Sequence, residues 1–192
     1  YAPLSLGITS LLFEGTPDYP AKDRWWDMTE RHGVTILYST PTAVRMFMKF
    51  GEEWINKHDL STLRLLGTVG EPINPEAWKW FYRVVGKEKL AIIDTWWQTE
   101  TGGFMIAPLS GLELVPLKPG SATYPLPSVK AEVYNDQGQP APQGDKGFLV
   151  IKSQWPGMLQ TLWKDPERYK QTYFGRWPNV YYTGDYAIED PD

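Results

Sequence analysis

Short apolar runs alternate with amphipathic segments over the first half of the chain. Four runs are typical of buried strands, and they occupy residues 8–13, 34–38, 63–67 and 90–95. The segments between them carry apolar residues at helical spacing and predict helices over residues 20–31, 40–54 and 74–85. Strands that alternate with helices of this length form βαβ units. The pattern therefore predicts an α/β fold with a mainly parallel sheet and flanking helices.

Local signals at the ends of these segments support the same elements. Thr40 followed by Pro41 is typical of an N-cap with proline in the first turn of a helix. Gly33 ends the first predicted helix, and His32 beside it is interpreted as a helix-end residue.

The pattern changes in the second half of the chain. Strands are predicted over 129–134, 147–152 and 180–185, and a short helix begins at Asp165-Pro166. Between the two halves lies a stretch rich in Gly, Pro and Ser without clear periodicity. We therefore expect an α/β subdomain over 1–107, a connecting segment over 108–128, and a smaller β-rich, distorted barrel-like portion over 129–192.

Composition narrows the possible functions. Lys plus Arg number 19 against 23 Asp plus Glu, a net charge of −4, so the chain lacks the basic stripe of a dedicated nucleic-acid binder. With no cysteine and two histidines, thiolate nucleophiles, disulfides and histidine-based zinc sites are not expected. No apolar run approaches the ~18 to 20 residues that span a bilayer. These features favour a cytoplasmic protein without nucleic-acid or membrane partners.

The segment from Asp94 to Gly103 carries the densest candidate chemistry. It follows a predicted strand and contains two indoles, two carboxylates, three hydroxyls and a glycine pair. Aromatic faces suit a nucleobase, hydroxyls suit phosphate, and a carboxylate suits the accompanying metal. Ligands of open α/β sheets bind at the carboxyl ends of the strands, where this segment is expected. The sequence therefore indicates nucleotide chemistry.

Two further segments lie at the ends of predicted strands and contain glycine and a carboxylate. They are Gly70-Glu71-Pro72 and Tyr182-Thr183-Gly184-Asp185. In order and spacing, the three segments resemble the adenylate-forming acyl-CoA synthetases, most closely the members that activate acetate. The resemblance covers the whole chain. It includes residues 13–15, 41–43, 70–78, 94–106, 120–123, 171–174 and 182–185.

The resemblance implies an ATP-dependent activation of acetate as acetyl-AMP, followed by transfer of the acetyl group to coenzyme A. It places ATP or AMP against residues of all three segments: Gly70, Glu71, Pro72, Asp94, Thr95, Trp96, Trp97, Gln98, Thr99 and Asp185. Trp96 would stack on the adenine, and Asp185 would accept both ribose hydroxyls. Thr99 and Glu100 would be the catalytic residues, Thr99 at the α-phosphate and Glu100 as the Mg²⁺ ligand.

Trp97 and Val69 are expected to line the acyl pocket. An indole at position 97 would close the pocket behind one or two carbons, which favours acetate. Propionate or 3-hydroxypropionate stays open as an alternative, because one methylene discriminates by only ~1–3 kcal/mol. A more remote alternative is a non-catalytic, aromatic-rich carbohydrate-binding module, given ten Trp and eleven Tyr residues.

The implied coenzyme A contacts are Asp18 and Thr40. The family has asparagine and alanine at these places, so this sequence departs from it at both. The resemblance also implies that the chain is a central fragment of the large N-terminal domain, since the phosphate loop, the hinge and the domain with the catalytic lysine match no part of it. We therefore expect the rest of its own polypeptide as a partner and no adenylation by the chain alone.

Overall fold

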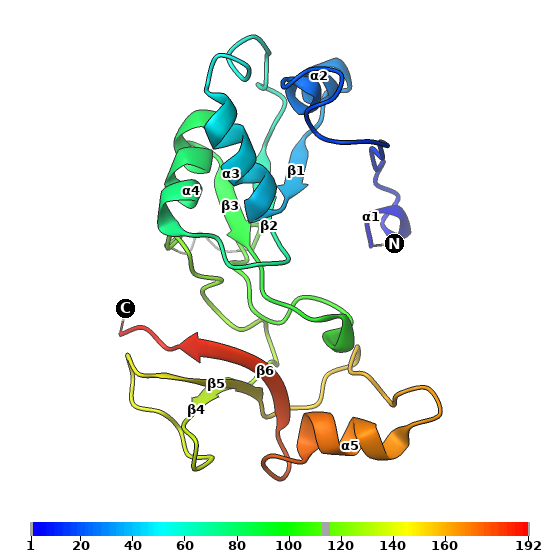
Figure 1. Cartoon of the computed structure of the whole chain (residues 1–192), viewed down its shortest axis with the longest axis vertical. Helices are drawn as coiled ribbons and strands as arrows, with labels where there is room; N and C mark the ends of the chain where they lie inside the picture. Colours follow the sequence, from blue (N-terminus) through cyan, green and yellow to red (C-terminus); the bar gives the residue numbers. More distant parts are fainter. Residues whose placement is uncertain (1, 113–115, 192) are drawn as a thin grey trace.

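Two three-stranded sheets organise the chain, one in each half (Figure 1). The computed structural model describes residues 2–112 and 116–191. The first sheet is parallel with the order β1-β2-β3, and the second is antiparallel with the order β4-β5-β6. The predicted α/β class is therefore confirmed. The second sheet does not close into a barrel within the described ranges.

The parallel sheet consists of β1 (Ile36–Ser39), β2 (Leu65–Thr68) and β3 (Ala91–Asp94). Its register pairs Ser39 with Thr68 and Thr68 with Asp94, so all three strands end at the same level. The segments that follow these strands therefore leave the sheet from one edge, as the βαβ prediction requires.

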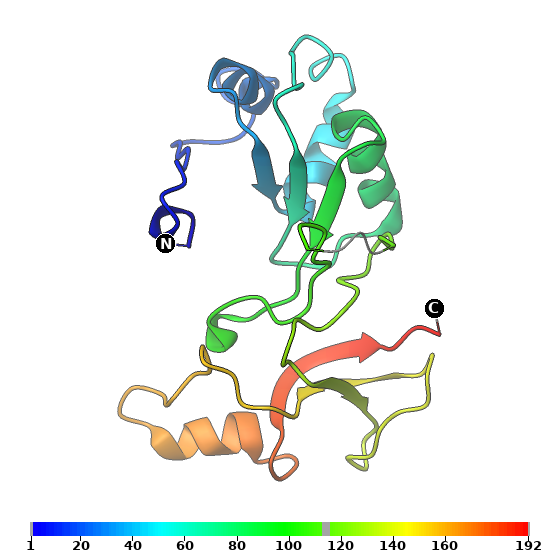
Figure 2. The same cartoon turned by 180° about the vertical axis from the view of Figure 1, so that it is seen from behind.

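Helices α2 (Arg24–Arg31), α3 (Pro41–Phe50) and α4 (Pro75–Trp80) accompany the parallel sheet, and α4 continues as a π-helical turn, η1 (Phe81–Val85). The Thr40 hydroxyl accepts the backbone N–H of Ala43, which confirms the predicted N-cap. Seen from behind, β1 to β3 lie in front of α3 and α4, so these two helices cover one face of the sheet (Figure 2).

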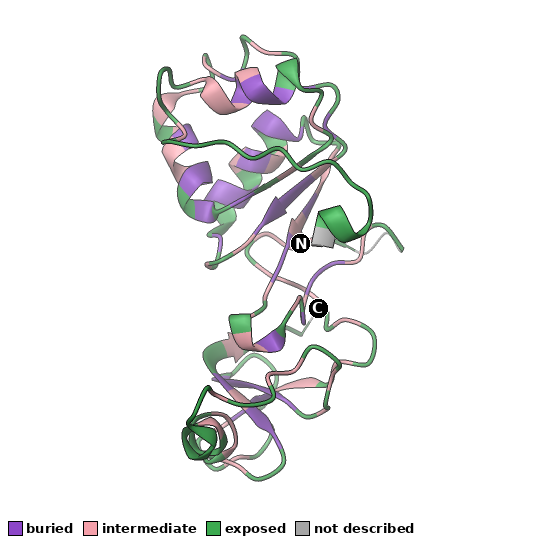
Figure 3. Ribbon diagram, turned by 90° about the vertical axis from the view of Figure 1, so that its right-hand side faces the viewer, coloured by how far each residue is buried: buried purple, intermediate pink, exposed green. Residues whose placement is uncertain are grey.

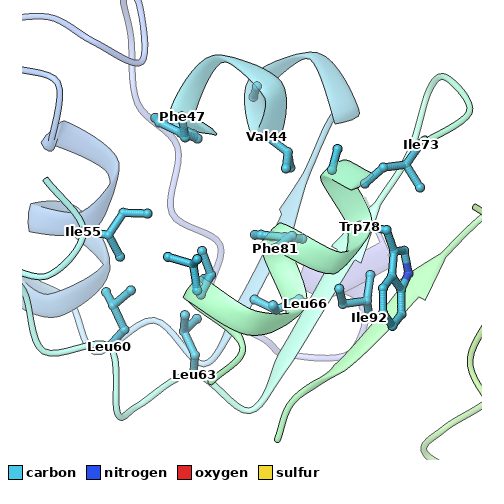
Figure 4. Close-up of a cluster of buried hydrophobic side chains, with 14 of the residues drawn as sticks. Val44, Phe47, Ile55, Leu60, Leu63, Leu66, Ile73, Trp78, Phe81 and Ile92 are labelled. Carbon is cyan, nitrogen blue, oxygen red and sulfur yellow. The ribbon is translucent and has the colours of Figure 1, made fainter. Parts of the chain in front are cut away.

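The main hydrophobic core lies between these helices and the sheet (Figure 3). Phe47 of α3 packs against Trp26 of α2 with ring centroids 4.8 Å apart. Leu66 and Ile92 contribute from the central and outer strands, and Phe81 contributes from the π-helical turn (Figure 4). The segments that follow β2 and β3, which include Gly70 to Pro72 and residues 94–103, thus begin at strands packed in this core.

The second body contains β4 (Ala131–Tyr134), β5 (Lys146–Ile151), α5 (Pro166–Phe174) and β6 (Tyr181–Ile188). The side chain of Asp165 accepts the backbone N–H of Arg168, so the predicted start of α5 is confirmed. The predicted strand 180–185 is too short, because β6 continues to Ile188 through an irregularity opposite β5.

The prediction of a buried strand over 8–13 is wrong. A short helix, α1 (Ala2–Ser5), precedes this segment, which is irregular and exposed, with Leu12 91% exposed. The segment does not pair with either sheet, and its C-terminal end contacts helix α2. The ring of Phe13 contacts Trp25 at 5.8 Å, and the Arg24 guanidinium donates to the Glu14 carbonyl.

Irregular chain connects the two bodies, and of the predicted connecting segment 108–128, residues 113–115 lie outside the described residues. Trp96 forms an isolated antiparallel bridge with Ile106, and Ile106 forms another with Pro125. A 3₁₀ turn, η2 (Thr99–Thr101), lies between these bridges and the second body. No helix in the described ranges is both long enough and apolar enough to cross a membrane.

Candidate functional site

A buried polar pair joins the ends of β2 and β3. The Thr68 hydroxyl donates to Oδ1 of Asp94 over 2.7 Å. Burial raises the pKa of Asp94, and the hydrogen bond from Thr68 opposes that shift. The Thr95 hydroxyl donates to the Thr68 carbonyl and lies 2.8 Å from the Tyr38 hydroxyl. Asp94 and Thr95 thus direct their side chains into the strand ends, where they fix the start of the 94–103 segment.

The segment after β2 is anchored to the N-terminus of α3. Gly70 has a φ of 93°, a conformation that favours glycine, and it turns the chain after Val69. The Glu71 carboxylate then accepts the backbone N–H of Thr42 and the guanidinium of Arg45, at 2.8 and 2.9 Å. Hydrogen bonding from the Thr42 side chain, then from Arg45, and to a lesser extent from the Thr42 backbone lowers the pKa of Glu71. Pro72 follows on the surface.

A β-bulge in β6 sets the position of Asp185. Phe148 pairs with Tyr186 and Val150 pairs with Tyr182, so three residues of β6 oppose the single residue Leu149 of β5. Within the bulge, the Thr183 hydroxyl donates to the Leu149 carbonyl and accepts the backbone N–H of Asp185. Bulges re-aim side chains. Asp185 therefore stands exposed in the middle of a strand and not at its tip.

The structure brings Asp185 against the 94–103 segment. Its Oδ2 accepts the indole N–H of Trp96 and the side-chain amide of Gln98, both at 3.0 Å. The same amide nitrogen donates to the Thr183 carbonyl, and the Tyr181 hydroxyl donates to Oε1 of Gln98. Two of the three segments singled out in the sequence therefore form one constellation.

Glu100 is held from the second body. The Tyr173 hydroxyl donates to its Oε1 over 2.8 Å, and its backbone carbonyl accepts the N–H of Leu159. Partial burial and the adjacent Glu100 carboxylate raise the pKa of Tyr173. Thr99, which opens the η2 turn, is exposed.

The single carboxylate of Glu100 limits the kind of metal ion that could bind here. No group of three or more His, Cys, Asp or Glu residues in the described part of the chain could enclose a metal ion. Mg²⁺ is commonly held by one or two carboxylates together with substrate phosphates and water. Glu100 alone therefore fits a magnesium ion that arrives with a nucleotide, and it does not fit a dedicated protein cage.

The η2 turn also contacts a segment that the sequence reasoning did not single out. The indole N–H of Trp155 donates to the Thr101 carbonyl over 2.7 Å. Gly102 has a φ of 71°, and a Cβ placed there would clash with the carbonyl oxygen of Gly157. Backbone from the second body thus packs directly on the turn that carries Thr99 and Glu100.

Trp97 belongs to an aromatic row at the end of the parallel sheet. Its indole meets the ring of Phe104 edge-on at 6.0 Å, and Phe104 meets Tyr38 at 6.1 Å. Trp97 is 40% exposed, so the row presents an apolar surface beside the strand ends. Val69 lies half-buried where β2 ends, with its backbone N–H donating to the Ser39 carbonyl.

Asp18 and Thr40 are not part of this constellation. Asp18 is exposed in the segment before α2, and the hydrogen bonds and ion pairs of the described residues do not join it to the other site residues. The Thr40 hydroxyl already accepts the N–H of Ala43 as the helix cap.

Several partners escaped the sequence reasoning. Tyr181 and Trp155 carried no signal of their own, while Phe104 and Tyr173 stood in the matched motifs 94–106 and 171–174 without an assigned role. The hydrogen bonds of Tyr181 and Tyr173 to the 94–103 segment connect residues 83 and 73 positions apart. Periodicity and local motifs contain no information about such pairs.

A family model and individual relatives point to the same protein family. The sequence model of the AMP-binding enzymes matches residues 1–163. Curated acetyl-coenzyme A synthetases are similar over nearly the whole chain. That of Pyrobaculum aerophilum is 60% identical over 99% of this chain, that of Rubrobacter xylanophilus 59% over 100%, and that of Caulobacter vibrioides 52% over 100%.

These alignments cover a minor part of each relative. This chain spans 28% of the length of the Pyrobaculum aerophilum protein and 30% of that of Rubrobacter xylanophilus.

Proposed function

The chain belongs to the AMP-binding enzyme family, and from this membership we propose that it supplies the nucleotide- and acyl-binding part of an acetate–CoA ligase. The enzyme would use ATP to activate acetate as acetyl-AMP, release pyrophosphate, and transfer the acetyl group to the thiol of coenzyme A. The observation that carries the proposal is the constellation in which Trp96 and Gln98 hold the carboxylate of Asp185.

The groups of this constellation, and the separate segment Gly70 to Pro72, each suit one part of a nucleotide. The exposed carboxylate of Asp185 accepts the ribose hydroxyls, as an ionised carboxylate can accept several O–H donors. Gly70, Glu71 and Pro72 form the edge against the adenine, and Trp96 offers its ring face. The indole N–H of Trp96 donates to Asp185, so the ring is held in one orientation before the nucleotide binds.

Thr99 and Glu100 act at the phosphates. The exposed hydroxyl of Thr99 donates to an α-phosphate oxygen as the acetate carboxylate attacks phosphorus. When bound, Mg²⁺ neutralises phosphate charge. Glu100 orients a carboxylate oxygen for this ion because its Oε1 is restrained by Tyr173. Catalysis by the chain's own residues is thus mainly positioning.

The acyl pocket lies at the aromatic row. Trp97 forms the floor and Val69 a wall, which limits the acid to two or three carbons. The names of the relatives favour acetate. Propionate or 3-hydroxypropionate is the second candidate, because the exposed Trp97 surface does not by itself exclude a third carbon. A carbohydrate-binding module is disfavoured, since Trp26 and Trp78 are buried in the core.

Coenzyme A is the least supported ligand of this part of the enzyme. A carboxylate at Asp18 would repel its phosphates, and Thr40 is engaged as a helix cap. We therefore assign these two residues to the edge of the coenzyme A path, with the main contacts elsewhere in the enzyme.

The active enzyme is proposed to be a longer polypeptide, in keeping with the 28% of the relative's length that this chain spans. In it, residues 1–107 form the α/β subdomain, 108–128 the connection, and 129–192 part of a distorted barrel. We place the enzyme in the cytoplasm, with small-molecule substrates and no nucleic-acid or membrane partner.

The test is ATP–pyrophosphate exchange by the full-length protein that carries this sequence, with acetate, propionate, butyrate and octanoate. Strong exchange with acetate that falls away by butyrate is the expected result. Exchange with octanoate would contradict the pocket, and no exchange with any acid would contradict the adenylation chemistry. The 192-residue chain alone is expected to give none, because it spans only 28% of the length of the Pyrobaculum aerophilum relative.

A further inference from the structure

The Asp185 carboxylate is oriented from one side only. Both of its hydrogen bonds from other side chains, those of Trp96 and Gln98, end on Oδ2. Its Oδ1 receives none from the described residues, and the side chain is exposed. A carboxylate held through one oxygen presents the other in a fixed direction, which reduces the entropy lost when a ligand binds.

The Gln98 amide can bind Asp185 in only one orientation. Its nitrogen faces two groups that only accept hydrogen bonds, the Thr183 carbonyl and Oδ2 of Asp185, at 2.8 and 3.0 Å. Its oxygen therefore points the opposite way, where the Tyr181 hydroxyl donates to it over 2.9 Å. A rotated amide would lose both bonds made by its nitrogen, because neither the Thr183 carbonyl nor the Asp185 carboxylate can donate to the amide oxygen.

Tyr181 is a rigid support for this amide. It is 2% exposed, and its ring stacks on Tyr173 at 5.4 Å and meets Trp155 edge-on at 5.3 Å. Burial raises the pKa of Tyr181, so its hydroxyl stays protonated and remains a donor. A hydroxyl inside a packed aromatic cluster thus fixes the amide, and the amide fixes the carboxylate.

We propose that Gln98 and Tyr181 are positioning residues for Asp185: together they aim its free oxygen at the ligand and so set how strongly the site selects ribose over deoxyribose. This inference rests on the proposed function, because it takes Asp185 as the acceptor of the ribose hydroxyls. Neither residue needs to touch the nucleotide sugar for this effect.

The experiment compares AMP with 2′-deoxy-AMP and 3′-deoxy-AMP by titration calorimetry, using the full-length protein that carries this sequence. The wild-type protein is expected to bind AMP about 10-fold more tightly than either analogue, the factor for about 1.4 kcal/mol. Tyr181→Phe keeps the ring but frees the amide. Gln98→Glu keeps the acceptor for Tyr181 but removes the donor to Asp185. Both are expected to reduce the ratio to about 3-fold or less.

Matched controls separate positioning from general damage. Tyr169→Phe also removes one hydroxyl from the second body, where it donates to the Leu159 carbonyl, and the ribose preference should stay at the wild-type value. Asp185→Asn should abolish the preference. Thermal melts establish that each variant is folded, and Gln98→Glu tests the inference even if Tyr181→Phe does not fold.

The outcomes distinguish the two levels of the proposal. If the wild-type protein has no ribose preference and Asp185→Asn changes nothing, the role of Asp185 in the proposed function fails. If the preference is present and depends on Asp185, but both Gln98→Glu and Tyr181→Phe retain it in full, the positioning inference is overturned while the proposed function stands.

Discussion

At the scale of single residues, the hydroxyl of Thr68 stabilises the buried carboxylate of Asp94 where β2 and β3 end. Thr68 is fully buried and Asp94 is 6% exposed, so the hydroxyl replaces water as the donor. Removing one member of a buried pair leaves the other without a partner, which costs about 1–3 kcal/mol.

Thr68→Val is therefore expected to lower the free energy of unfolding by about 1–3 kcal/mol at pH 7, measured by urea denaturation. Thr29→Val is the matched control. Thr29 is equally buried, but its hydroxyl donates to the helical carbonyl of Trp25 and leaves no charge behind. Its effect should stay below about 1 kcal/mol. Equal losses for both variants would contradict the assigned role of Thr68.

The penalty of Thr68→Val should also depend on pH. Burial already raises the pKa of Asp94 above its unfolded value. The contribution of Asp94 to the free energy of unfolding is therefore lost as pH rises through the folded pKa. Without the Thr68 hydrogen bond, the folded pKa rises further and the loss grows. The penalty is expected to be smallest below the unfolded pKa, near pH 3.5 or lower, and full at pH 7. A penalty that grows on acidification would contradict this account.

The sequence could predict interactions of this scale only where they are local. The caps at Thr40 and Asp165 follow from residues three positions away, and both are present. The bonds from Gln98 to Asp185 and from Tyr181 to Gln98 span 87 and 83 residues. They depend on how two sheets dock, which no local pattern encodes.

At the scale of elements, sequence periodicity predicted the strands and helices that pack in the parallel sheet and its core. It failed for the segment 8–13, which pairs with no described strand, and for the bulged strand β6. The three parallel strands and their helices were predicted to within a few residues. The apolar run 8–13 reads as a strand, but no strand of the described chain pairs with it. The strand was predicted to end at Asp185, whereas residues 183–185 form a bulge inside β6, which continues to Ile188.

The η2 turn gives a prediction at this scale. Gly102→Ala should destabilise the protein by about 2 kcal/mol or more, because alanine is disfavoured at positive φ and its Cβ would meet the Gly157 carbonyl. Gly103→Ala, one residue further, meets no atom within 4 Å and should change stability by less than about 0.5 kcal/mol. Thermal denaturation of both variants tests the close approach, and a tolerated Gly102→Ala would show that it is absent.

At the scale of the whole molecule, two bodies with separate cores are coupled through the 94–103 segment. The Gln98 side chain donates to the Thr183 carbonyl in β6, and the Trp155 indole donates to the Thr101 carbonyl. The constellation of Trp96, Gln98 and Asp185 therefore lies where the bodies meet. A nucleotide bound across these residues would add a further link between the bodies.

Cutting one of these links should loosen the junction without melting either core. Trp155→Phe keeps an aromatic ring against Tyr181 but removes the indole N–H that binds the Thr101 carbonyl. Loss of about 1 kcal/mol of local stability should speed amide hydrogen exchange at residues 101–102 and 159 by about 5-fold, while β1 to β3 exchange as in the wild type.

The matched control is Trp177→Phe, because this indole packs on Tyr134 and Phe148 in the second body and its N–H makes no hydrogen bond within the described ranges. It should leave exchange at 101–102 unchanged. Faster exchange across β1 to β3 in Trp155→Phe would mean that the two bodies unfold as one unit. Unchanged exchange at 101–102 and 159 would mean that the indole bond does not hold the turn. The expected result, a local effect confined to the junction, requires that the bodies keep independent cores and share only the segment that carries the site.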